Sequence, residues 1–318
     1  MRLTFNEYIE RRNYEAEMLA EKQIMYSGKK YGQIVFLAGG AGSGKGFAIN
    51  NFMPGSDFKI RDVDELKIAF QKLDGLNKFT LEDLMKKYGD KMSDSDKNYI
   101  QTKVIDKGFS IKDLDLKTPE HVFALHVLVR ATGAKDKTLD LILDSAVKGR
   151  LPNILFDSTF ADMSDINTYL PKLIEMGYES RDIHVTWVLT NYEIAITNNK
   201  TRDRVVPDDI MLKTHTGAAK TILSLVKDGM PKDIDGGFYV ILNNPENTVY
   251  VVDPKTGENY VNLSKKGKMR KVVADFTYVT MKKPGKAITT DADVKKQLMT
   301  WVTANVPADA IKGDEVKL

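Results

Sequence analysis

Hydrophobic residues along the chain fall into short continuous runs, separated by longer stretches in which they recur at helical spacing. Five of the short runs have the length and the β-branched or aromatic content of buried strands. They are residues 34–38, 58–61, 153–156, 183–189 and 238–242. Because these runs alternate with helical patterns, the sequence predicts an α/β fold with a mostly parallel five-stranded sheet and helices on both faces.

The stretch between the second and third predicted strands has almost entirely helical spacing. Glycines and a Thr-Pro pair divide it into helices expected at residues 65–73, 81–88, 95–107, 119–131 and 137–148. A crossover between two parallel strands usually needs only one helix. Residues 64–150 are therefore interpreted as a helical insertion, and we expect it to carry part of the substrate site.

Further elements are expected on both sides of this insertion and at the chain ends. Helices are predicted over residues 3–27, over 166–176, from 191, from 208 to about 227, and over 291–305. Short strands divided by turn signals are expected at residues 248–252, 259–263, 271–275 and 277–281. The predicted organisation is an N-terminal helix at 1–30, a central α/β domain at 31–245, and an antiparallel β extension with a final helix at 246–318.

Composition and charge place few limits on function. Of the 318 residues, 42% are hydrophobic and 29% are charged, as in an ordinary globular protein. The 47 Lys and Arg against 44 Asp and Glu leave a formal net charge of +3, so no overall field favours nucleic acid or a membrane surface. The densest basic run, residues 265–271, is interpreted as a solvated turn between strands.

Cysteine is absent from the chain, which excludes disulfides, thiolate catalysis and cysteine-based zinc sites. The first residues lack the apolar core of a signal peptide, and no apolar run approaches the roughly 20 residues needed to cross a bilayer. The expected location is therefore cytoplasmic, without a membrane partner.

A glycine-rich segment follows the first predicted strand directly. It satisfies the spacing G-x-x-x-x-G-K between Gly39 and Lys45, and it precedes a segment that can begin a helix. In such a loop the backbone N–H groups cradle phosphates, the helix N-terminus adds positive potential, and Lys45 reaches the outer phosphates. The residues expected to bind the nucleotide are Gly39, Gly40, Ala41, Gly42, Ser43, Gly44, Lys45 and Gly46.

Carboxylates follow the second and third predicted strands, at the edge where an open parallel sheet binds ligands. Asp64 is the predicted base that accepts the proton of an acceptor hydroxyl. Asp62 and Lys67 are expected to contact the acceptor, since Lys67 shares a helical face with Asp64 and can neutralise a phosphate. Asp157 is expected to order the water ligands of Mg²⁺.

A polar stretch at residues 197–207 separates two predicted helices and contains Lys200, Arg202 and Arg204. Arginines on a mobile segment can close over phosphates and stabilise the charge of a transition state. Arg202 and Arg204 are therefore both predicted to be catalytic, as is Lys45. The four histidines show no metal-ligand spacing and are interpreted as packed or surface residues. They are His121, His126, His184 and His215.

With these motifs, the chain resembles the zeta-toxin-like branch of the P-loop kinases and, more distantly, the polynucleotide 5′-hydroxyl kinases. The resemblance covers about residues 31–245 and rests on residues 39–45, 62–67, 154–159 and 202–207. It implies an adenylate-kinase-like sheet, an ATP–magnesium phosphotransferase, Asp64 as the base, and an arginine lid. Members of this branch act on targets as different as nucleotide-sugars and nucleic-acid ends, so the acceptor does not carry over.

Position 46 departs from this branch, which has Thr or Ser after the lysine, whereas this chain has Gly46 followed by Phe47. Ser43, Asp64 and Asp157 are then expected to hold magnesium through waters. The leading prediction is an ATP-dependent kinase for a hydroxyl or phosphate of a small metabolite, a nucleotide or a nucleic-acid end. The alternative is a nucleotide-binding scaffold with little or no turnover, with a protein partner that contacts residues 246–318.

Overall fold

The computed structural model describes residues 24, 26–53, 57–61, 63–76, 78, 80–144, 150–202, 205–253, 256–263 and 269–312, without the side chains of residues 63, 64, 262 and 263. The predicted helix over residues 3–27 lies almost entirely outside the described residues, as does most of the basic run at 265–271. In the described part of the chain, no helix is both long enough and apolar enough to cross a membrane.

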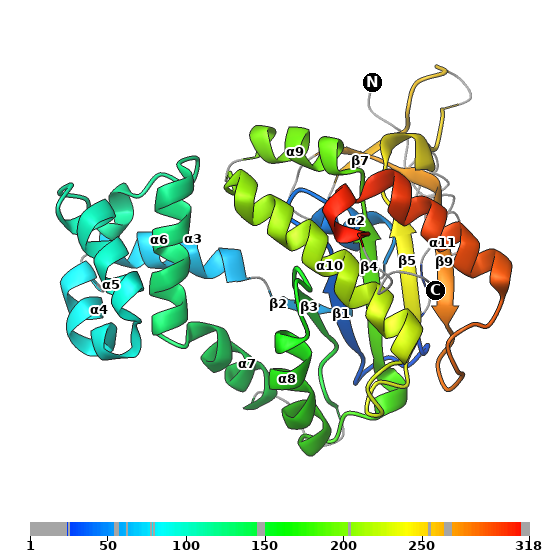
Figure 1. The fold of residues 1–318 in the computed structure, drawn as a ribbon, viewed down its shortest axis with the longest axis horizontal. Coiled ribbons are helices and arrows are strands. Elements are labelled where there is room, and N and C mark those ends of the chain that lie inside the picture. The colour runs from blue at the N-terminus through cyan, green and yellow to red at the C-terminus, as the bar shows by residue number, and fades with distance from the viewer. Residues whose placement is uncertain are drawn as a thin grey trace, which may run out of the picture.

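A seven-stranded sheet runs through the centre of the molecule (Figure 1). From one edge to the other, its strands are β2 (Lys59–Arg61), β3 (Ile154–Asp157), β1 (Ile34–Ala38), β4 (Ile183–Leu189), β5 (Phe238–Leu242), β9 (Val273–Lys282) and β6 (Thr248–Tyr250). The first five strands are parallel, whereas β9 is antiparallel to both of its neighbours. The predicted α/β class with a mostly parallel sheet is confirmed, and the five parallel strands are those expected from the sequence.

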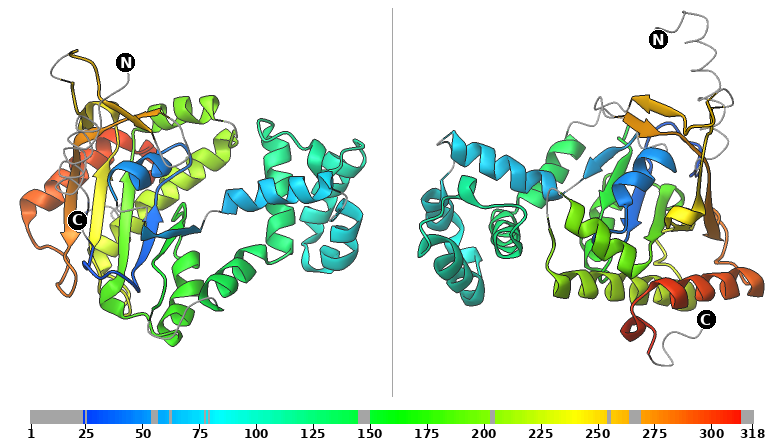
Figure 2. Two further views of the ribbon diagram at one scale, coloured as in Figure 1. Left: turned by 180° about the vertical axis from the view of Figure 1, so that it is seen from behind. Right: turned by 90° about the horizontal axis from the view of Figure 1, so that it is seen from above.

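The central strands are buried on both faces, which is why their sequences read as continuous hydrophobic runs. In β1, Ile34 and Phe36 belong to one hydrophobic cluster, and Val35 and Leu37 belong to the cluster on the opposite face. Helices cover both faces of the sheet, as Figure 2 shows from behind and from above. These helices are α2 (Lys45–Asn51), α8 (Ser164–Glu175), α9 (Tyr192–Thr201), α10 (Asp208–Asp228) and α11 (Ala292–Asn305).

The first four described α-helices between β2 and β3 stand to one side of the sheet (Figures 1 and 2), and we call them the helical body. They have a hydrophobic cluster of their own, which includes the fully buried Leu84, Ile100 and Leu125. The helical body consists of α3 (Val63–Gly75), α4 (Leu81–Tyr88), α5 (Asp94–Ile100) and α6 (Pro119–Ala131). The next helix, α7 (Ala134–Asp144), connects it to the sheet, because Leu139 and Leu143 belong to the hydrophobic cluster of the main sheet. A π-helical turn, Gln101–Ile105, continues α5.

Strong start signals explain why α4 and α6 have the bounds that the sequence predicts. Thr80 and Asp83 form a reciprocal capping box at the start of α4, and Pro119 occupies the first position of α6. Single 3₁₀ turns lie at Gly89–Lys91, Ile111–Asp113, Ser180–Asp182, Pro245–Asn247 and Ala308–Ala310.

The C-terminal strands differ from the prediction in two respects. The strands expected at 271–275 and 277–281 largely form the single strand β9, because Phe276 continues the ladder instead of turning the chain. Phe276 is buried, and its ring stacks on Phe52 with a centroid separation of 4.2 Å. Since β9 pairs with β5 and with β6, the antiparallel extension is part of the main sheet. The short strands β7 (Val261–Leu263) and β8 (Met269–Lys271) pair separately. Residues 269–271 of the basic run, which were expected in a turn, are therefore in a strand because they pair with β7.

Candidate nucleotide-binding site

The loop between β1 and α2 uses backbone conformations that glycine adopts most readily. Gly42 and Gly44 have φ angles of 77° and 80°, in the left-handed region. A Cβ at Gly42 would lie 2.3 Å from the carbonyl oxygen of Ala195, and one at Gly44 would lie 2.3 Å from Nδ2 of Asn243. Both the turn of the loop and its close packing against α9 and the segment after β5 therefore require glycine.

Two neighbouring side chains of α10 hold the Ala41 residue of this loop. The Ala41 N–H donates to Oγ1 of Thr214 at 3.3 Å, and Nε2 of His215 donates to the Ala41 carbonyl at 2.7 Å. Burial lowers the pKa of His215, the hydrogen bond to the Ala41 carbonyl opposes this shift, and the nearby Lys45 cation adds to it. The ring is therefore neutral at neutral pH, with its proton on Nε2.

Other loop carbonyls are also bound by side chains outside the loop. The Ser43 carbonyl accepts hydrogen bonds from Oγ1 of Thr190 at 2.7 Å and from Nδ2 of Asn243 at 2.8 Å. The Gly42 carbonyl accepts from Nδ2 of Asn198 on α9 at 3.2 Å. Since Thr190 and Asn243 directly follow β4 and β5, the carboxyl ends of these strands help to fix the loop.

Lys45 and Asp157 come together beside the loop. Nζ of Lys45 donates to the carbonyl of Gly39 at 2.6 Å and lies 3.6 Å from Oδ1 of Asp157. The register of β3 on β1 pairs Asp157 with Leu37, which brings the carboxylate next to the start of the loop. Both side chains are mostly buried, with exposed fractions of 14% for Lys45 and 20% for Asp157. The structure therefore brings these two sequence-predicted residues into one site.

Ser43 contributes a buried hydroxyl to the same loop. The residue is 1% exposed, and its Oγ has no hydrogen-bond partner among the described residues. A buried polar atom without a partner is unfavourable unless an ion, a ligand or a water satisfies it. Because magnesium takes hydroxyl and carboxylate oxygens as ligands or binds them through water, the chemistry of Ser43 and Asp157 fits this ion.

Asn199, near the end of α9, binds the backbone on the far side of the predicted lid arginines. The buried side chain of Asn199 donates to the Val206 carbonyl at 2.7 Å and accepts from the Val206 N–H at 3.0 Å. Arg202 is exposed just after α9, which extends to Thr201, so part of the expected polar stretch at 197–207 is helical. Arg204 lies outside the described residues.

Two of the residues predicted to act on the acceptor, Lys67 and the backbone of Asp64, lie on α3. Asp62 is outside the described residues, and so is the side chain of Asp64, whose backbone is in the first turn of α3. Lys67 is buried on the same helix. Desolvation, together with three nearby cations, lowers the pKa of His126 on α6 to about 4. These cations are Lys67, Arg130 and Lys135.

Three residues that hold the loop are not singled out from the sequence, namely Thr190, Thr214 and Asn243, and His215 is interpreted there only as a packed or surface residue. Thr190 and Asn243 directly follow predicted strands, so the rule that singled out Asp157 applies equally to them. Thr214 and His215 lie in the middle of a long amphipathic helix. Their spacing gives no sign of a contact with Ala41, which precedes them by 173 and 174 residues.

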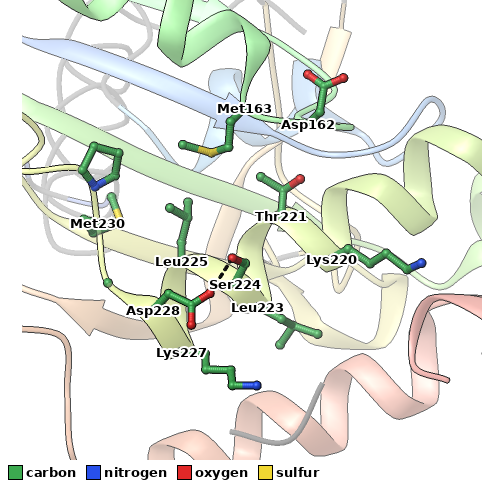
Figure 3. Close-up of a pocket in the computed structure, with 12 residues that line it drawn as sticks. Asp162, Met163, Lys220, Thr221, Leu223, Ser224, Leu225, Lys227, Asp228 and Met230 are labelled. Atoms are coloured by element: carbon green, nitrogen blue, oxygen red, sulfur yellow. Dashed lines mark hydrogen bonds between the residues drawn. The ribbon is translucent and has the colours of Figure 1, made fainter. Parts of the chain in front are cut away.

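A cavity of about 760 Å³ lies between the C-terminal half of α10 and the start of α8 (Figure 3). Met163, Leu225 and Met230 contribute apolar surface to it, and Ser224 donates a hydrogen bond to Asp228 on its wall at 2.9 Å. The residues that line it include none of the predicted site residues. This cavity is separate from the glycine-rich loop.

Comparisons with known proteins identify similar structures but no similar sequences. No protein-family model matches the chain, and no curated protein sequence matches it. A chain of the AvrRxo1-ORF1:AvrRxo1-ORF2 complex with ATP is similar over 97% of this chain and 73% of that one, with a TM-score of 0.41 and 11% identity. The native form of that complex gives a TM-score of 0.41 and 11% identity over 94% and 73% of the two chains. A structure of the PezAT toxin–antitoxin system of Streptococcus pneumoniae gives a TM-score of 0.35 and 12% identity over 76% and 80%.

Proposed function

We propose that the chain is an ATP-dependent phosphotransferase of the zeta-toxin-like P-loop kinase type. It transfers the γ-phosphate of ATP to a hydroxyl or phosphate of a small metabolite, a nucleotide or a nucleic-acid end. One observation carries the proposal: the Lys45 ammonium lies between the Gly39 carbonyl and the Asp157 carboxylate at the carboxyl ends of adjacent parallel strands. A lysine held there, at the end of a glycine-rich loop, is suited to neutralise the outer phosphates of a nucleotide.

In this proposal the loop residues Gly39–Gly46 hold the nucleotide, and Lys45 offsets charge on its outer phosphates. Asp64 accepts the proton of the acceptor hydroxyl while the acceptor oxygen bonds to the γ-phosphorus. The bond from that phosphorus to the β–γ bridging oxygen breaks, and ADP leaves. Arg202 and Arg204 stabilise the charge of the transferred group.

Asp62 and Lys67 position the acceptor in this proposal. Ser43, Asp64 and Asp157 would hold magnesium through waters, and the bound ion would supply positive charge that offsets the charge of the phosphates.

A second candidate is a nucleotide-binding scaffold with little or no turnover. Gly46 favours it, because this residue offers no hydroxyl at the position where P-loop sequences have Ser or Thr. Residues 246–318 then serve as the contact surface for a protein partner.

The test is to incubate the full chain with magnesium and γ-labelled ATP, in the presence of a metabolite extract or short oligonucleotides. We expect a phosphorylated acceptor in the mass spectrum and its loss in Lys45→Met and Asp64→Asn. ATP binding without any phosphorylated product supports the scaffold, and absence of ATP binding by calorimetry overturns both candidates.

A further inference from the structure

The loop that follows β3 contacts the start of the glycine-rich loop. The Ser158 N–H donates to the Leu37 carbonyl at 3.1 Å, and the Gly39 N–H donates to the Thr159 carbonyl at 3.4 Å. These bonds extend the β1–β3 pairing past its end, through the two residues that directly follow Asp157. A shift of residues 158–159 therefore moves Asp157 and Gly39 together.

The conformation of this loop is strained. Phe160 has a φ of 55°, and it is the only non-glycine residue with a positive φ in the part of the chain that the structure describes. A left-handed conformation costs an ordinary residue about 1–2 kcal/mol. Two contacts offset this cost: the Phe160 ring is buried beside Phe36, and the Phe160 N–H donates to Ser158 Oγ at 3.3 Å. The loop is thus held in one shape by its surroundings.

A chain of polar contacts leads from this loop to α7, the helix that connects the helical body to the sheet. Ser158 Oγ donates to one carboxylate oxygen of Asp165, in the first turn of α8. The other carboxylate oxygen of Asp165 accepts from Nζ of Lys135, in the first turn of α7. Asp165 therefore links the strained loop directly to α7.

Lys135 lies where the helical body joins the sheet. Its backbone carbonyl accepts a hydrogen bond from Nη2 of Arg61, the last residue of β2. The buried Arg61 guanidinium lies 4.3 Å from the ring centre of Tyr169, and its Nη2 donates to the Tyr169 hydroxyl at 3.0 Å. The chain segments that lead into and out of the helical body are thus tied to each other and to α8, and any displacement of α7 acts on Lys135.

We propose that Lys135, Asp165 and Ser158 form a positioning relay between the helical body and the nucleotide site. The relay rests on the proposed function, in which the helical body contributes to acceptor binding. When the helical body takes up its acceptor-bound position, Lys135 and Asp165 fix Ser158, and through it the Asp157 carboxylate and the Thr159 carbonyl beside the glycine-rich loop. None of the three residues touches the reacting groups, so each is a positioning residue.

The structure supplies a matched control for this proposal. Lys172 on α8 donates to Asp140 on α7, so a second lysine–aspartate pair joins the same two helices. Neither Lys172 nor Asp140 is connected to residues 158–160 by any contact described here. If α7 only loosens from α8, loss of either lysine–aspartate pair has the same effect on residues 158–160. In the relay, only loss of the Lys135–Asp165 pair affects these residues.

The experiment compares Asp165→Asn and Asp140→Asn in the full chain by hydrogen exchange followed by mass spectrometry. The relay predicts that Asp165→Asn raises exchange in residues 157–160 and 39–45 about tenfold, the size typical of coupling through contiguous contacts. Asp140→Asn leaves exchange there unchanged. Equal exchange in both variants, or no increase in Asp165→Asn, overturns the relay. If Asp165→Asn fails to fold, Ser158→Ala takes its place in the comparison.

A kinetic measurement separates the relay from the proposed function. With ATP, magnesium and the acceptor identified in the labelling experiment, we expect Asp165→Asn and Lys135→Met to lower kcat about tenfold while KM for ATP changes less than about threefold, and Lys135→Arg to restore most of kcat. If the wild type does not bind ATP, the proposed function fails, and the exchange measurement still decides the relay. A larger change in KM than in kcat contradicts the relay.

Discussion

The imidazole of His215 donates from Nε2 to the carbonyl oxygen of Ala41, 2.7 Å away, so α10 holds the glycine-rich loop directly. The same ring occupies the space in which a side chain at position 40 would lie, because a Cβ on Gly40 would be 2.2 Å from its Cδ2. Gly40 is therefore required by His215.

This relationship predicts that the effects of Gly40→Ala and His215→Ala are not additive in the double variant. Gly40→Ala forces the buried ring of His215 to move, and such overpacking costs about 1–3 kcal/mol. His215→Ala removes one hydrogen bond from the loop, worth about 1 kcal/mol, and weakens ATP binding about fivefold. In the double variant the new methyl group fills the vacated space. We expect ATP affinity, measured by calorimetry, to be higher in the double variant than in Gly40→Ala alone.

Position 46 offers a second test, because nothing lies within 4 Å of a Cβ placed there and the residue is in the first turn of α2. Gly46→Ala and Gly46→Ser should both fold, with stability raised by about 0.5–1 kcal/mol since glycine is a poor helix former. If the chain is a kinase, only the serine variant adds a hydroxyl oxygen of the kind that magnesium takes. We expect Gly46→Ser to bind ATP more tightly than Gly46→Ala when magnesium is present and equally when it is chelated. Equal affinity in magnesium would show that position 46 does not contribute to the ion.

His184 makes the stability of the protein depend on pH. Its ring is fully buried on β4, Nδ1 accepts from the Gly237 N–H at 2.7 Å, and Nε2 has no partner among the described residues. Burial lowers the pKa of His184 to about 3, although Asp182 opposes the shift. The unfolded chain binds this proton near pH 6.5, so the contribution of His184 to stability is complete above that pH and is lost as the pH falls toward 3.

The expected slope in that range is at most about 1.4 kcal/mol per pH unit. His184→Asn keeps an acceptor for Gly237 and cannot titrate. Urea unfolding at several pH values should therefore show a shallower acid dependence for the variant. If the free energy of unfolding depends on pH equally in the wild type and in His184→Asn, another titrating group causes the loss of stability in acid.

Arg61 should be essential for the attachment of the helical body to the sheet. Its guanidinium lies over the rings of Tyr169 and Phe156 and donates to the Lys135 carbonyl. Removing these contacts in Arg61→Ala should cost about 2–4 kcal/mol of unfolding free energy. Arg61→Lys keeps the charge but loses the planar group that stacks, so we expect it to recover less than half of the loss. Chemical denaturation measures the unfolding free energy of both variants. If Arg61→Ala is as stable as the wild type, Arg61 does not attach the helical body to the sheet.

The elements that the sequence predicts best are those whose signals are local. The central strands are buried on both faces, so residues 34–38, 183–189 and 238–242 form continuous hydrophobic runs from which strands can be predicted. The break expected at Phe276 was wrong because the residue is held by long-range packing on Phe52, which no local pattern reports.

The same distinction applies to the site. Lys45 and Asp157 could be paired in advance, because the rule that ligands bind at the carboxyl ends of parallel strands connects positions far apart in the chain. The contacts of Thr214 and His215 with Ala41 depend on where α10 crosses the loop, and that crossing is set by the packing of the whole helix on the sheet. The roles proposed for Asp64, Arg202 and Arg204 remain predictions.

The glycine-rich loop is held by side chains from four separate places, the ends of β4 and β5 and the helices α9 and α10. Its shape is therefore a product of folding and not of ligand binding. A loop that is already ordered loses little conformational entropy when a ligand arrives, so its affinity reflects the contacts themselves. The same arrangement also makes folding depend on ligand binding. A ligand that recognises this loop shape binds only the folded chain, so a higher ligand concentration shifts the unfolding equilibrium of the sheet domain toward the folded state.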